Sequence, residues 1–78
     1  MLLNSLISES FDNTPFAKDD NSTKENIIYK NDKYEFNIRL KKNHIDVVVP
    51  LSYCDYRTSF TDCYKAIEFL NLHINNMK

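Results

Sequence analysis

Four side chains in the sequence could bind a metal or supply a nucleophile and a base: His44, Cys54, Cys63 and His73. Two thiolates and two imidazoles would complete a tetrahedral zinc site. Zinc-binding sequences, however, place their ligands in close pairs such as C-x₂₋₄-C and H-x₃₋₅-H, and neither pair occurs here. The spacing therefore argues against a metal site, and we expect no cofactor.

A cysteine–histidine catalytic pair is the second chemical option. His44 and Cys54 would lie at opposite ends of one predicted strand, roughly 20 Å apart. His73 would lie on a helix that runs away from Cys54. Two carboxylates, Asp55 and Asp62, flank the predicted start of that helix, where capping and the helix dipole account for them. We therefore predict no enzymatic activity.

The complete absence of glycine excludes several other kinds of site. Phosphate-binding loops, dinucleotide-binding turns and nucleophile elbows need glycine for a positive φ or for close backbone approach. No apolar run approaches the roughly 18 residues of a membrane span. The first residues also lack the features of a secretory signal. We therefore expect two reduced thiols and a cytoplasmic location.

Hydrophobic periodicity predicts one α+β domain over residues 1–78. Apolar residues at helical spacing predict a short N-terminal helix over 2–11, and the polar stretch 12–26 is typical of a loop or arm. A capping-box pattern that begins at Ser59 predicts a C-terminal helix from residue 60 to about residue 76.

Strict alternation of apolar and polar residues predicts the strands between these helices. The pattern gives a three-stranded antiparallel meander, with strands at 27–30, 33–41 and 45–51. The predicted order is α-β-β-β-α, with the C-terminal helix packed on one sheet face. In this arrangement the strand at 45–51 is an edge, and it has apolar residues on both faces.

Protein binding is indicated by apolar side chains outside the predicted core. Phe69 and Leu72 fall away from the apolar stripe of the C-terminal helix, and Leu72 lies almost opposite to it. Such side chains indicate a contact with a second subunit or with another protein. The alternative interpretations are that the N-terminal helix covers them or that they are single exposed apolar residues, which are common. The apolar edge strand, with Val48 facing outward, would allow a partner to add a strand.

The loop before the C-terminal helix adds three candidates for the same role: Tyr53, Tyr56 and Arg57. Tyrosine and arginine are the residue types enriched at binding hot spots. Capping of the core ends by the two tyrosines is the alternative interpretation.

Nucleic-acid binding is the alternative function, because residues 27–51 carry five basic against three acidic residues. A sheet with a C-terminal helix over 27–77 resembles the layout of AP2-type and integrase N-terminal DNA-binding domains. The resemblance implies that the exposed sheet face meets DNA. Glu35 and Asp46 would oppose phosphates there. The basic candidates in the hairpin 30–42 are Lys30, Lys33, Arg39, Lys41 and Lys42.

We therefore predict a small non-catalytic protein-binding module. Its size, its lack of glycine and its many Asn, Lys and Ile residues are typical of accessory proteins encoded by phages or mobile elements. Such a protein could inhibit a host enzyme or defence complex by occluding its surface. A homodimer, in which a second copy completes a small core, is a further interpretation.

Overall fold

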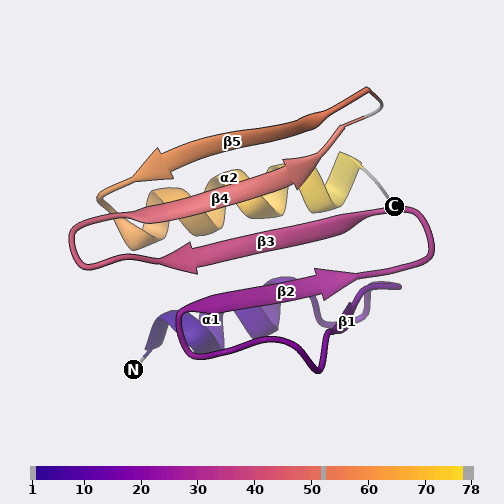
Figure 1. Ribbon diagram of the computed structural model, residues 1–78, viewed down its shortest axis with the longest axis horizontal. Coiled ribbons are helices and arrows are strands. Elements are labelled where there is room, and N and C mark those ends of the chain that lie inside the picture. Colours follow the sequence, from indigo (N-terminus) through magenta and orange to yellow (C-terminus); the bar gives the residue numbers. More distant parts are fainter. Residues whose placement is uncertain (1, 52, 77–78) are drawn as a thin grey trace.

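The computed structural model describes residues 2–51 and 53–76, which form one antiparallel sheet and two helices (Figure 1). The elements in chain order are α1 (Leu2–Ser10), β1 (Ala17–Lys18), β2 (Asn26–Lys30), β3 (Glu35–Leu40), β4 (Ile45–Pro50), β5 (Asp55–Phe60) and α2 (Cys63–Asn76). Neither helix in this described part is long and apolar enough to cross a membrane.

The strands follow one another across the sheet in the order β1-β2-β3-β4-β5, and each is antiparallel to its neighbours. Ile38 of β3 lies opposite Val47 of β4, which in turn lies opposite Thr58 of β5. Both helices cover the same face of this sheet and lie behind it in Figure 1. The other face has no helix over it, and we call it the open face.

The prediction of three strands is wrong, because the sheet has five. The largest error concerns β5. Its residues were predicted to form a loop and the first turn of the C-terminal helix. Tyr56, Thr58 and Phe60 alternate along β5 and lie opposite Val49, Val47 and Ile45 of β4. β4 is therefore an interior strand, and the apolar edge predicted at 45–51 does not exist.

The start of α2 also differs from the prediction, because residues 55–60 belong to β5. The predicted cap, Ser59, belongs to β5, and its hydroxyl donates a hydrogen bond to the Asp46 carboxylate at 2.6 Å. Asp62 takes the capping role instead, since its Oδ1 accepts a hydrogen bond from the Tyr64 N–H at 2.9 Å. The helix therefore begins at Cys63, three residues later than the capping-box pattern indicated.

The segment 12–26, predicted as a loop or arm, is packed against the sheet. Its residues Ala17 and Lys18 form β1, which pairs with the end of β2. The Ser22 hydroxyl accepts a hydrogen bond from the Ile28 N–H at 3.0 Å and donates one to the Ile28 carbonyl at 3.2 Å. Phe16 is buried in the core and anchors the segment.

The core lies between the sheet and the two helices, in two adjoining parts. Under α1, four aromatic side chains pack together, and they are Phe11, Phe16, Tyr29 and Phe36. Phe11 stacks on Tyr29 with ring centroids 4.1 Å apart, and Phe16 meets Phe36 edge-on at 5.0 Å. Under α2, the buried side chains are aliphatic and include Ala66, Leu70, Ile74, Val47 and Val49.

Candidate functional site

The reactive side chains named from the sequence lie apart in the fold. Cys54 is exposed between β4 and β5, whereas Cys63 is half-buried at the start of α2. His44 lies between β3 and β4, and His73 lies near the end of α2, against the Phe69 ring. Within residues 2–51 and 53–76, no three His, Cys, Asp or Glu side chains are grouped to hold a metal ion.

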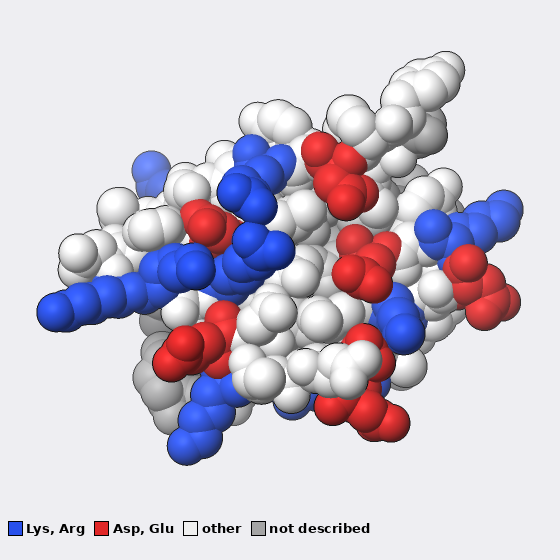
Figure 2. All heavy atoms as spheres, in the orientation of Figure 1, with Lys and Arg blue, Asp and Glu red and all other residues white. Residues whose placement is uncertain are grey.

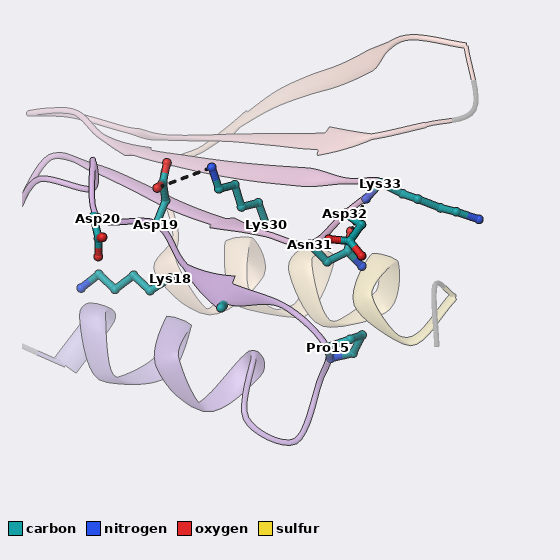
Figure 3. Close-up of a pocket in the computed structure, with 9 residues that line it drawn as sticks. Pro15, Lys18, Asp19, Asp20, Lys30, Asn31, Asp32 and Lys33 are labelled. Carbon is teal, nitrogen blue, oxygen red and sulfur yellow. Dashed lines mark hydrogen bonds and ion pairs between the residues drawn. The ribbon is translucent and has the colours of Figure 1, made fainter.

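One hollow, of about 650 Å³, is formed where β1 and the segment around it meet the β2–β3 turn. It is lined mainly by charged side chains of both signs, including Lys18, Asp20 and Lys33. Asp19 and Lys30 point toward each other across it and form an ion pair at 3.6 Å (Figure 3). Lys33 points away from the rest in Figure 3, so the charged groups do not converge on one position.

A polar network on the open face joins β4 to β5. Asp46 is buried, and it accepts the hydrogen bond from Ser59 and lies 3.3 Å from the Nε2 atom of His44. The Ser59 hydrogen bond is the main cause that lowers the pKa of Asp46, and burial opposes it. The positive charges of Arg57 and Lys41, and that of His44 when it is protonated, lower this pKa further. The network connects two strands, and a structural role accounts for it.

The basic residues proposed for nucleic-acid binding do not form one surface. Lys30 and Lys33 lie near the β2–β3 turn, and Lys41 and Lys42 lie near the β3–β4 turn, at the opposite end of β3. A strand of this length separates the two turns by about 20 Å. Arg39 is on the open face, directly opposite Asp46 in the register.

Figure 2 shows how charge is distributed over the open face. Basic side chains gather where β3 ends and β4 begins, with acidic side chains interleaved, and acidic side chains lie over the start of β3 and of β5. A shallow hollow between these regions is lined by Glu35, Asn37, Arg39, Val48, Asp55 and Arg57. This mixed charge differs from the continuous basic surface of a dedicated nucleic-acid-binding domain. The five-stranded sheet also departs from the three-stranded layout of the DNA-binding domains that the sequence resembled.

The clearest exposed apolar surface lies on the other face, where α2 packs behind β4 and flanks the edge strand β5 (Figure 1). We call it the β5/α2 patch, and it consists of Tyr56, Phe60, Phe69 and Leu72. The Phe69 ring lies 5.3 Å from the Phe60 ring and 6.1 Å from the Tyr56 ring. Tyr56 is 47% exposed and Leu72 is 58% exposed, so much of the patch faces water.

The patch includes a groove with a volume of about 590 Å³. Phe60, Phe69 and Leu72 supply its apolar lining, and Lys65 and Glu68 of α2 supply polar groups beside it. The groove combines apolar side chains with charged ones, as protein contact surfaces do.

The structure brings together three of the six residues proposed for partner binding: Tyr56, Phe69 and Leu72. Phe69 is half-buried rather than fully exposed, because it packs on Phe60 and on His73, with the His73 ring at 4.4 Å. Phe60 was not predicted as a site residue, because the predicted C-terminal helix began at this residue, whereas Phe60 in fact ends β5. The alternation of Tyr56, Thr58 and Phe60 was the signal that could have found it.

The other three proposed residues lie elsewhere. Tyr53 is fully exposed between β4 and β5. Val48 and Arg57 lie opposite each other on the open face, on the far side of the sheet from Phe69. Strand addition beside Val48 is excluded, because β5 already occupies that edge of β4.

No protein-family model matches the chain, and no curated protein or solved structure is significantly similar to it.

Proposed function

We propose that this chain is a non-catalytic protein-binding module and that the β5/α2 patch is its contact surface. The observation that supports the proposal is the contiguity of the patch, in which two elements contribute apolar side chains to one exposed groove. Isolated exposed apolar residues are common on soluble proteins, but a contiguous group with a polar rim is typical of a binding surface.

The biological role that we propose is inhibition, in which the module occludes the surface of a host enzyme or defence complex. The small size and the composition support an origin in a phage or mobile element. We also propose a cytoplasmic location. Both cysteines are free, which agrees with a reducing compartment.

Affinity capture from a lysate of the source cells, with nuclease present, tests this proposal. The tagged chain should retain a protein, and Leu72→Glu should lose it because a carboxylate would be buried in an apolar contact. Tyr64→Glu is the matched control, since Tyr64 is 68% exposed on α2 and lies outside the patch. Circular dichroism should show both variants folded.

Two outcomes contradict the proposal. Full retention of the protein by Leu72→Glu would exclude the β5/α2 patch as the contact surface. Recovery of nucleic acid, or of proteins that disappear with nuclease, would move the function to the basic residues near the β3–β4 turn. If the captured protein is an enzyme, its activity with and without the chain measures inhibition directly.

A further inference from the structure

Among residues 2–51 and 53–76, the edge strand β5 pairs only with β4, so the other side of its backbone has no strand beside it. The Leu51 N–H donates to the Cys54 carbonyl at 2.9 Å, so these two residues form a hydrogen-bonded pair of the β4–β5 hairpin. Such pairs alternate along an antiparallel ladder. The backbone groups of Tyr56, Thr58 and Phe60 therefore face β4, and those of Asp55, Arg57 and Ser59 face away from the sheet.

This edge lacks the features that usually prevent strand pairing. β5 contains no proline, and its register with β4 is continuous from Asp55 to Phe60, without a bulge. The only charged residues on it are Asp55 and Arg57, which carry opposite charges. The β5/α2 patch lies along the same edge. β5 thus offers backbone pairing and apolar contact in one place.

We propose that the partner at this site is a second copy of the chain, paired through β5 about a two-fold axis at Tyr56. This inference rests on the proposed function, because it takes the β5/α2 patch as a protein-contact surface, and a host protein bound there would compete with the second copy. A two-fold interface requires a surface that is complementary to itself. β5 meets this requirement in both its charges and its backbone groups.

The charges select the register. With Tyr56 on the axis, Asp55 of each copy lies opposite Arg57 of the other, so two oppositely charged pairs form. Both residues have outward-facing backbone groups, so these pairs are also the hydrogen-bonded ones. An axis at Arg57 would place two guanidinium groups opposite each other. An axis at Thr58 would place Arg57 opposite Ser59 and form no ion pair.

The same arrangement accounts for the apolar flank of α2. A two-fold axis perpendicular to the sheet leaves both copies of α2 on one face of a continuous sheet. Phe69 packs on β5 residues, and Leu72 shares its groove with Phe60, so both side chains lie on the side of α2 that would face the junction. Tyr56 of each copy would meet the other at the axis. The dimer therefore covers the most exposed parts of the patch.

Light scattering after size exclusion measures the first expectation, a mass about twice the 9.3 kDa of one chain. Asp55→Arg alone, or Arg57→Asp alone, converts both ion pairs to like-charge pairs. Each change should raise the dissociation constant of the dimer about tenfold or more. A mixture of the two single variants should associate again, because each arginine then faces an aspartate.

The double variant Asp55→Arg/Arg57→Asp is the most discriminating case. It exchanges the two charges within one chain, so self-pairing in the Tyr56 register stays complementary and the dissociation constant should return to within about threefold of the original. A different partner protein that binds through these two charges would lose affinity for the double variant. Equal weakening in the single and double variants would overturn the proposal.

Cross-linking tests the register itself. In a Cys54→Ser/Cys63→Ser background, which removes both native thiols, Tyr56→Cys should form a disulfide-linked dimer under mild oxidation, since residues at the axis lie about 4.5 Å apart between Cα atoms. Thr58→Cys is the control, because its two copies would be about 13 Å apart along the strands. Cross-linking at residue 58 instead of residue 56 would refute this register.

The two proposals fail separately. A chain that stays monomeric at millimolar concentration, yet captures a protein that Leu72→Glu loses, excludes the second copy and leaves the binding module intact. A monomeric chain that captures no protein excludes both.

Discussion

Two aromatic clusters lie on the helix-covered face of the sheet, and they differ in how much water reaches them. In the first, which is Phe11, Phe16, Tyr29 and Phe36, every side chain is at most 8% exposed. In the second, which is Tyr56, Phe60 and Phe69, Tyr56 is 47% exposed and the two phenylalanines are half-buried. Ring separations are similar, at 5.0 Å between Phe16 and Phe36 and 5.3 Å between Phe60 and Phe69.

The difference comes from what covers each cluster rather than from the residue types. The first cluster includes Phe11, directly after α1, and Phe16, just before β1, so the chain itself closes over β2 and β3. The second cluster lies at the sheet edge, where α2 covers β5 from one side and no element in the described residues lies beyond β5. The same aromatic chemistry therefore stabilises the fold in one place and remains available for binding in the other.

Removal of a ring from the first cluster should have the largest effect on stability. Phe36→Ala should lower the free energy of unfolding by about 3–5 kcal/mol, because the ring is fully buried and its loss leaves a cavity. That is a large part of the roughly 5–15 kcal/mol available to a small domain. Urea denaturation followed by circular dichroism measures the change. A loss below about 1 kcal/mol would show that the cluster does not support the fold.

The matched change in the second cluster should cost much less. Phe69→Ala should lower the free energy of unfolding by about 1 kcal/mol, since a half-buried ring removes less apolar surface from water. The measurement should be made at low protein concentration, so that association does not add to stability. Equal losses for Phe36→Ala and Phe69→Ala would remove the distinction between the clusters.

The hydrogen bond between Ser59 and Asp46 predicts a pH dependence for the β5 side of the sheet. The pKa of Asp46 is lowered from its ordinary value of 3.8, first by this hydrogen bond. A carboxyl group with a lowered folded-state pKa adds stability above its unfolded-state pKa, and this stability is lost as pH falls through the folded-state value.

Ser59→Ala should therefore raise the pKa of Asp46, which an NMR titration of the carboxyl carbon would report. The variant should be less stable than the original chain at neutral pH, and the difference should shrink as pH falls below about 4. Thr58→Ala, one residue away and facing the helices, is the control that should leave this pKa unchanged. If the stability difference does not vary with pH, the contribution of this hydrogen bond to stability does not depend on the ionisation of Asp46.

Leu72→Ser should have the smallest effect on stability. Leu72 is 58% exposed, so the free energy of unfolding should change by less than about 0.5 kcal/mol. The same change should weaken association through the β5/α2 patch, which light scattering or affinity capture would detect. A strong loss of stability would place Leu72 with the first cluster instead of with the binding surface.

Much of the fold was predictable because several segments have only one arrangement that buries their apolar residues. The alternation in β3 and β4 places Phe36, Ile38 and Val47 on one face in any sheet. The helical spacing in α2 does the same for Leu70 and Ile74, and it correctly predicted that Leu72 is exposed. For these segments the period of the pattern decides both the element and its buried face.

Only the tertiary structure decided that residues 55–60 form the strand β5. The position of the candidate site depends on this strand. Residues 55–60 are compatible with a strand and also, through Ser59 and Asp62, with the start of a helix. Pairing with β4 settles the choice, because it satisfies backbone groups of β4 and covers an apolar strand that would otherwise be an exposed edge. The two residues of β1 give too short a pattern to predict a strand. The sequence by itself determined the composition of each face, and the contacts between distant segments decided which of these faces meets water.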